Sequence, residues 1–211
     1  MANKKKIYEF ILSSVFSVVS VVKKKMEKEI KKTLASRTKN YLFDQRLRRA
    51  AVLIPLFKKT GEYHILFTKR TEKVPHHKGQ ISFPGGQWDK EDPDLLATAL
   101  RETEEEMGIA PQDVQILGEL DDFCTASSDF CISPFVGLIP YPYPFRVNPH
   151  EIAEVIEAPL NVLRQENHMR QEIFSRDGEP FPVYFYEYQD YTIWGATARI
   201  LKEFLDLLSC F

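Results

Sequence analysis

The apolar and polar residues of this chain alternate mainly in short runs, which favours strands over long helices. Apolar runs bounded by turn residues predict strands over residues 51–57, 63–70, 114–123, 132–139, 183–188 and 192–194. Helical periodicity covers residues 93–107, 159–165 and 197–208. Strands, a helix, further strands and a closing helix together predict an α/β (or α+β) fold, an α/β/α sandwich with a mixed sheet.

The most informative helix is predicted within residues 85–109. Asp92 suits the N-cap position, Pro93 suits the first helical position, and Asp94 complements the positive end of the helix dipole. Gly108 is placed to end the helix in the left-handed conformation that glycine adopts at little cost. The sequence therefore predicts a loop that leads into a helix ending at Gly108.

Three glutamates of this helix, Glu102, Glu105 and Glu106, are spaced i, i+3 and i+4 and share one face. The other side carries an apolar stripe of Leu96, Ala99, Leu100, Thr103 and Met107. We expect the stripe to face the core and the acids to face outward. The three acids could simply form a solvated face of the helix. Like charges at this spacing repel, however, and Arg101 is the nearby residue that could offset the repulsion. A divalent cation such as Mg²⁺ would reverse that repulsion.

Residues 101–109, RETEEEMGI, resemble the core of the Nudix box, R-E-U-x-E-E-x-G-U with U a bulky or aliphatic residue. Fourteen residues separate Gly86 from Arg101, one more than the family pattern has, and Asp92 stands where the first glutamate of the box is expected. The resemblance extends over residues 46–208. It implies the Nudix α/β/α fold, with the box as a loop and helix, and a metal-dependent hydrolase of diphosphate bonds. By this resemblance Glu102, Glu105 and Glu106 hold Mg²⁺ or Mn²⁺, and Arg101 orients the glutamates.

A narrower resemblance covers the stretch before the box. Residues 66–71 (LFTKRT), Gly79 and residues 83–86 (FPGG) are similar to the motif of Nudix coenzyme A diphosphatases. This likeness implies that Arg70 and Lys78 contact phosphates. It also implies that the loop frames the diphosphate with Gly79 and the backbone of Phe83, Pro84, Gly85 and Gly86.

One position departs from this narrower motif. Pro75 stands where the motif has a second arginine, whose planar fork would bind phosphate. His76, His77 and Lys78 follow and either replace part of that charge or are exposed loop residues. The substrate expected from the resemblance is coenzyme A or acyl-coenzyme A, cleaved to 3′,5′-ADP and 4′-phosphopantetheine or its acyl form. Alternatives are another diphosphate, such as ADP-ribose or a dinucleotide, and a non-catalytic nucleotide sensor, a class that typically loses the box acids.

A general base is also required, to accept a proton from the attacking water. Glu151 and Glu154 are candidates, in a predicted loop and helix start after Pro149. In several Nudix enzymes an acid from this region has that role. Either residue could instead be a helix N-terminal charge without a catalytic part.

Charge is distributed unevenly along the chain. Residues 1–49 hold fourteen Lys or Arg against four Asp or Glu, and the remaining residues hold 14 against 26. An acidic body argues against nucleic acid as the main partner, and the resemblance implies a small-molecule diphosphate substrate instead. The three cysteines, Cys124, Cys131 and Cys210, have no metal-ligand spacing. We expect reduced thiols in a cytoplasmic protein.

The chain divides into a basic N-terminal extension, residues 1–45, and a Nudix hydrolase domain, residues 46–211. Within the extension, residues 1–25 place an apolar run of sixteen residues between two lysine triplets. Sixteen residues are too few for a comfortable membrane-spanning helix, and no signal-peptide cleavage site follows. This segment could bind an anionic membrane surface, or be an appended or misassigned start before Met26. The oligomeric state, monomer or homodimer, is left open.

Overall fold

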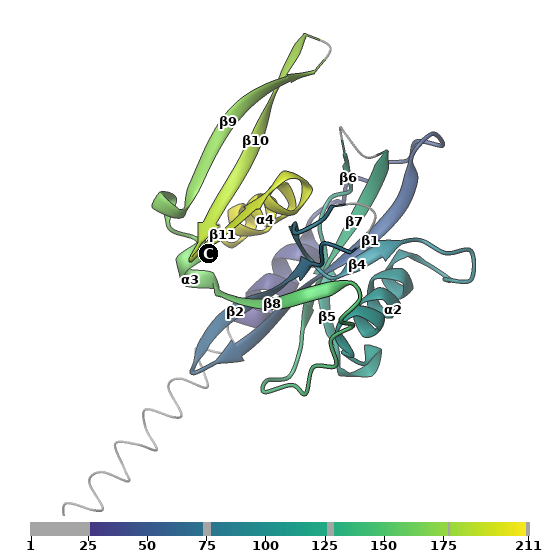
Figure 1. Cartoon of the computed structure of the whole chain (residues 1–211), viewed down its shortest axis with the longest axis vertical. Coiled ribbons are helices and arrows are strands. Elements are labelled where there is room, and N and C mark those ends of the chain that lie inside the picture. The colour runs from purple at the N-terminus through teal and green to yellow at the C-terminus, as the bar shows by residue number, and fades with distance from the viewer. Residues whose placement is uncertain (1–25, 74–76, 126–128, 177, 210–211) are drawn as a thin grey trace, which may run out of the picture.

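The computed structural model describes residues 26–73, 77–125, 129–176 and 178–209 (Figure 1). The expectations for residues 1–25, Pro75, His76 and Cys210 lie outside these ranges. In the portion of the chain that the structure describes, every helix is too short or too polar to cross a membrane.

The main sheet has eight strands: β1 (Arg48–Lys59), β2 (Glu62–Arg70), β3 (Ile81–Ser82), β4 (Gly85–Gln87), β5 (Gln115–Glu119), β6 (Phe123–Cys124), β7 (Phe130–Leu138) and β8 (Ile152–Pro159). Its path is β3-β2-β1-β7-β5, with β4 paired to β1, β6 to β7 and β8 to β2. β1 and β7 run parallel, whereas the other neighbouring strands run antiparallel. The prediction of a mixed sheet is confirmed.

Each face of the main sheet is covered by helices. On one face α2 (Leu95–Met107) packs against β1 and β4 around an apolar cluster that includes Leu53, Leu66 and Met107. On the other face the helix over residues 26–36 and α4 (Gly195–Leu208) cover a larger cluster. Ile30 and Leu34 are buried in this cluster, so residues 26–36 pack against the domain that follows them. The predicted α/β/α sandwich is confirmed.

A second, three-stranded sheet lies beside α4. Its order is β11 (Tyr191–Trp194), β10 (Glu179–Tyr188) and β9 (Met169–Arg176). The outer half of the β9–β10 hairpin stands away from the rest of the molecule (Figure 1). Three short helical segments complete the fold: η1 (Pro111–Asp113), α3 (Leu160–Leu163) and η2 (Glu166–His168).

Several predicted element boundaries differ from those observed. Asp94, not Asp92, is the N-cap of α2 and accepts a hydrogen bond from the Ala97 backbone N–H, so the helix begins two residues later. Gly108 ends α2 with φ 68°, as predicted. The helix start predicted after Pro149 is wrong, because residues 152–159 pair with β2 as a strand. The strand predicted over residues 114–123 is interrupted between β5 and β6.

The prediction of reduced thiols is wrong for two of the three cysteines. Cys124 and Cys131 face each other in the antiparallel register of β6 and β7, with Cα atoms 4.0 Å apart, and form a disulfide. Strand pairing brings their side chains together, a constraint that seven residues of sequence separation do not reveal.

Candidate active site

Glu106 is the most buried acid of α2, with 2% of its surface exposed. The prediction that the acids face outward is therefore wrong for this residue. The Gly85 backbone N–H donates to Glu106 Oε2 at 3.3 Å, and Arg70 Nη1 lies 3.6 Å from Oε1. Burial raises the pKa of Glu106 to about 8, although the positive charge of Arg70 opposes the shift. A carboxyl group held in this way is well suited to bind a cation.

Glu102 and Glu105 are both paired with Arg101. Arg101 Nη1 donates to Glu102 Oε1 at 2.9 Å and to Glu105 Oε1 at 3.3 Å. Burial raises the pKa of Glu102, and the charge of Arg101 acts in the opposite direction. Glu105 is more exposed, as predicted for an outward-facing acid. Arg101 thus fixes the orientation of two of the three box glutamates.

Asp92 anchors Arg101 in turn, a role that the sequence analysis missed. Arg101 Nε and Nη2 donate to the two oxygens of Asp92 at 2.9 and 3.0 Å. The buried carboxylate also accepts from the Thr98 hydroxyl and the Asp89 backbone N–H. These donors, Arg101 above all, hold the pKa of Asp92 below its usual range. The box pattern could have indicated this role of Asp92, because the pattern has an acid at that position.

Two glycines allow the box loop to lie against the acids. At Gly86 an added Cβ would come within 2.4 Å of the Glu102 carboxyl carbon. At Gly85, where φ is +148°, it would meet the Ala51 carbonyl oxygen at 2.3 Å. The loop can pass this close to β1 and to Glu102 only because both positions lack a side chain.

The neighbouring Phe83 and Pro84 serve the core and the backbone. Phe83 is buried and stacks on Phe67, with ring centroids 4.8 Å apart. The Pro84 carbonyl accepts from the Leu53 backbone N–H at 2.9 Å. Any contact of Phe83 with substrate would therefore be made by its backbone and not by its ring.

The basic residues predicted to bind phosphate differ in their surroundings. Arg70 ends β2 beside Glu106, and its buried Nε has no hydrogen-bond partner among the residues that the structure describes. Lys78 is exposed, and Gly79 has φ +64°, where an added Cβ would lie 2.7 Å from Glu72 Oε1. Of these three residues, Arg70 is the one that contacts an acid of α2 in the described part of the chain. An unused donor on the buried Nε of a partly exposed guanidinium favours an anionic ligand at this point.

The loop that carries Glu151 is joined to the end of α2. The backbone N–H groups of Arg146 and Asn148 donate to the carbonyls of Met107 and Glu106, at 2.8 and 2.9 Å. Asn148 Nδ2 donates to Glu151 Oε1 at 3.2 Å. The charge of Glu151 contributes to the raised pKa values of Glu102 and Glu106. The structure therefore brings Glu151 close to the box acids.

Glu154, the alternative base, lies elsewhere. It pairs with Lys69 in the register between β8 and β2 and accepts a short hydrogen bond from the Tyr191 hydroxyl. Lys69 Nζ lies over the Tyr191 ring, 5.6 Å from its centroid. Tyr191 packs against the core cluster on the α4 side of the main sheet. Glu154 thus faces away from Glu106.

The carboxylates fit a hard divalent cation in their chemistry. The three box glutamates, Glu102, Glu105 and Glu106, are oxygen donors, and Glu106 is the buried one. Burial and the charges of Glu102 and Glu151 raise the pKa of Glu106. As the side chains stand within the described ranges, no three His, Cys, Asp or Glu residues converge closely enough to hold a metal ion. Arg101 and Arg70 instead pair with the glutamates. A small reorientation of side chains on α2 would be needed for a metal to bind.

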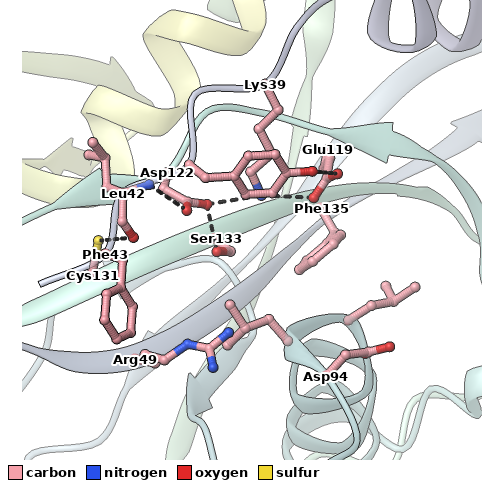
Figure 2. A pocket seen from close by; sticks show the side chains of 13 residues that line it. Lys39, Leu42, Phe43, Arg49, Asp94, Glu119, Asp122, Cys131, Ser133 and Phe135 are labelled. Carbon is pink, nitrogen blue, oxygen red and sulfur yellow. Dashed lines mark hydrogen bonds and ion pairs between the residues drawn. The ribbon is translucent and has the colours of Figure 1, made fainter. Parts of the chain in front are cut away.

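A separate cavity of about 370 Å³ lies at the other end of α2 (Figure 2). Its apolar wall includes Leu42, Phe43 and Leu95, and none of the predicted site residues lines it. At its polar end Lys39 Nζ lies 2.7 Å from Glu119 and 2.9 Å from Asp122. Both carboxylates therefore share one lysine, and Asp122 also accepts a hydrogen bond from the Ser133 hydroxyl.

Comparisons with known proteins show the family to which the chain is similar. A family model described as a NUDIX domain matches residues 47–176. The uncharacterized Nudix hydrolase NudL of Photorhabdus laumondii is 40% identical over 156 residues, covering 74% of this chain and 82% of that protein. The protein of the same description from Yersinia pestis is 37% identical over 172 residues, covering 82% and 85%.

Among solved structures, the MutT/nudix family protein from Enterococcus faecalis is similar with a TM-score of 0.55 and 14% identity, covering 80% of this chain and 64% of that one. This likeness supports the fold alone. The matched domain, the two curated relatives and the box acids on α2 agree, and the chain belongs to the Nudix hydrolase family.

Proposed function

We propose that this Nudix hydrolase cleaves the diphosphate bond of coenzyme A or acyl-coenzyme A, with Mg²⁺ or Mn²⁺ held by Glu102, Glu105 and Glu106. The observation that carries the proposal is the pairing of buried Glu106 with Arg70, whose Nε finds no hydrogen-bond partner within the described ranges. Arg70 belongs to the LFTKRT stretch that resembles the coenzyme A diphosphatase motif. A phosphate oxygen is the ligand that such a guanidinium binds best.

A bound divalent cation supplies charge neutralisation at phosphorus and a more acidic water. The residues of the chain position the reactants. Arg70 would donate to a non-bridging phosphate oxygen, and the backbone of residues 83–86 would lie along the diphosphate. Arg101, held by Asp92, keeps Glu102 and Glu105 oriented.

Glu151 is the base that we propose. A water oxygen attacks one phosphorus, the bond from that phosphorus to the bridging oxygen breaks, and Glu151 takes up the proton of the water. The products are 3′,5′-ADP and 4′-phosphopantetheine, or its acyl form. Asn148 holds Glu151 Oε1 and leaves its second carboxylate oxygen available for this transfer.

A second substrate class is favoured by one departure from the motif. Pro75 replaces the expected arginine, so one phosphate contact is missing, and ADP-ribose or a dinucleotide would need fewer such contacts. A non-catalytic sensor is disfavoured because all three box glutamates are present. We also propose that nucleic acid is not a partner, since residues 50–211 carry 26 acidic against 14 basic residues. The expectation of a cytoplasmic protein rested on reduced thiols and loses that support with the Cys124–Cys131 disulfide.

The test is hydrolysis of coenzyme A by the full-length protein with Mg²⁺ or Mn²⁺, with ADP-ribose and diadenosine polyphosphates assayed in parallel. Chromatography of the products should show a 3′-phosphorylated adenosine nucleotide and phosphopantetheine, with coenzyme A cleaved fastest. Faster cleavage of another diphosphate would overturn the coenzyme A assignment. No cleavage of any diphosphate with either metal would overturn the proposed activity.

A further inference from the structure

The outer half of the β9–β10 hairpin is a two-stranded ribbon without support from the body. β11 pairs only with Phe185–Tyr188 of β10. Within the described ranges, no strand lies beside the remaining part of β10 or beside the outer edge of β9. Seven of the eight β9 residues are exposed. Because a two-stranded ribbon is only marginally stable in water, a hairpin of this kind is expected to gain stability from a partner.

The two edges of this ribbon differ in their capacity to accept another strand. Pro180 and Pro182 of β10 lack an N–H group, yet the pairing of β10 with β9 continues past both of them. Their nitrogens therefore point away from β9, toward the free edge of β10. Neither nitrogen can donate a hydrogen bond, and this edge is blocked. β9 contains no proline. Its outward N–H and C=O groups belong to the residues facing the prolines, Ile173 and Ser175.

The open edge also carries large apolar side chains. Ile173 is 64% exposed and Phe174 is 45% exposed. Phe174 continues an aromatic row across the hairpin, since it lies 6.5 Å from Phe181 in centroid distance. An exposed, apolar edge strand without proline is a surface that pairs with another strand.

We propose that β9 pairs antiparallel with β9 of a second copy of this chain, about a two-fold axis at Phe174. This centre places Glu172 opposite Arg176 of the second copy, twice by symmetry. It also lets the outward backbone groups of Ile173 bond to those of Ser175. Moving the centre to Ile173 would place Arg170 opposite Arg176, and moving it to Glu172 would place that acid opposite itself.

A centre at Gln171 also matches opposite charges, Arg170 with Glu172, but it pairs only residues 169–173 at the root of the hairpin. The centre at Phe174 uses the half that stands clear of the body (Figure 1). One strand pair buries less surface than a permanent dimer does. We therefore expect association with a dissociation constant on the order of micromolar.

Cysteine cross-linking of the full-length chain tests the register, in a Cys210→Ser background. Two Phe174 positions would form a non-hydrogen-bonded pair with Cα atoms about 4.5 Å apart, within the reach of a disulfide. Phe174→Cys should oxidise to a covalent dimer, whereas Gln171→Cys should remain monomeric on a non-reducing gel. Cross-linking of Gln171→Cys in place of Phe174→Cys, or of neither, would overturn the proposal.

A second variant tests the interface without a cross-link. Ile173→Pro removes an outward N–H and leaves the β9–β10 ladder intact, whereas Ile173→Thr keeps that N–H. Sedimentation velocity at about 100 µM should show dimers for the wild type and for Ile173→Thr, and monomers for Ile173→Pro. A monomeric wild type, or a dimer that persists in Ile173→Pro, would contradict the interface. Hydrolysis rates should be equal in all three proteins, because the hairpin lies away from Glu106, so the test is independent of the substrate.

Discussion

The two faces of the main sheet bury different kinds of residue. The α2 face encloses charge: Glu106 is 2% exposed and Asp92 is 8% exposed. On the opposite face the cluster under α4 consists of apolar and tyrosine side chains, and charged groups such as Glu154 lie at its rim. Burying charge is costly unless it is paired or bound to a cation. The buried acids lie on the α2 face, which is also the face where hydrolysis is expected to take place.

The largest effect should come from removing the buried charge. Glu106→Gln keeps the size of the side chain and loses the anionic oxygen, so the hydrolysis rate with Mg²⁺ should fall about 1,000-fold. The free energy of unfolding should stay equal or rise, because a desolvated carboxyl group is removed. The matched control is Glu104→Gln, an exposed acid of the same helix, which should behave as wild type. Equal rates for both variants would remove Glu106 from the mechanism.

A pair of glutamates on opposite faces sharpens the comparison further. Glu151→Gln should lower kcat about 100-fold, the usual contribution of a general base. Glu154→Gln should change kcat less than about twofold, because its carboxylate pairs with Tyr191 on the α4 side. Steady-state rates from pH 5 to 10 measure both. If the Glu154 variant lost activity and the Glu151 variant did not, then catalysis would not be confined to the α2 face of the main sheet.

Two glycines give the next comparison, Gly86 beside the acids of α2 and Gly178 in the β9–β10 hairpin. Gly86→Ala should cost about 10–100-fold in rate, because the added methyl group would displace the Glu102 carboxyl group from its present position. At Gly178 in the hairpin an added methyl group would meet no atom within 4 Å among the described residues beyond its chain neighbours, but its φ of +85° makes any side chain strained. Gly178→Ala should lose about 1 kcal/mol in unfolding free energy and nothing in rate. Thermal unfolding and turnover measured on both variants would reveal whether space near the acids, and not backbone strain, limits activity.

The sequence predicted the α2 region well because local rules act there. Gly108 ends the helix as expected, and the spacing of the box acids identifies them independently of the rest of the fold. Burial of Glu106 could not be predicted, since it depends on Arg70 and Gly85, which are distant in sequence. Residues 152–159 have Ile152, Val155 and Ile156 at helical spacing, yet pairing with β2 makes them a strand.

The β9–β10 hairpin was predicted less well, because local sequence rules give little information about an exposed strand. β9 is exposed on both faces, so its sequence lacks the alternation by which strands are recognised, and it was not predicted at all. β10 and β11 were predicted because they contain apolar runs that reach the core at Tyr186 and Ile193. Sequence patterns report burial, and a strand that buries nothing within one chain leaves no such pattern.

The smallest effect concerns two aspartates near the start of α2: Asp92, which was predicted to be the N-cap, and Asp94, which is the N-cap. Asp92→Asn weakens the attachment of Arg101, so unfolding free energy should fall by about 1–2 kcal/mol, with Arg101 partly accessible to water. The rate should fall about tenfold, because Glu102 and Glu105 lose their fixed orientation. Asp94→Asn should change neither quantity measurably, since asparagine is an equally good N-cap. If Asp94→Asn were the more damaging change, then the start of α2, and not the attachment of Arg101, would determine how the acids are held.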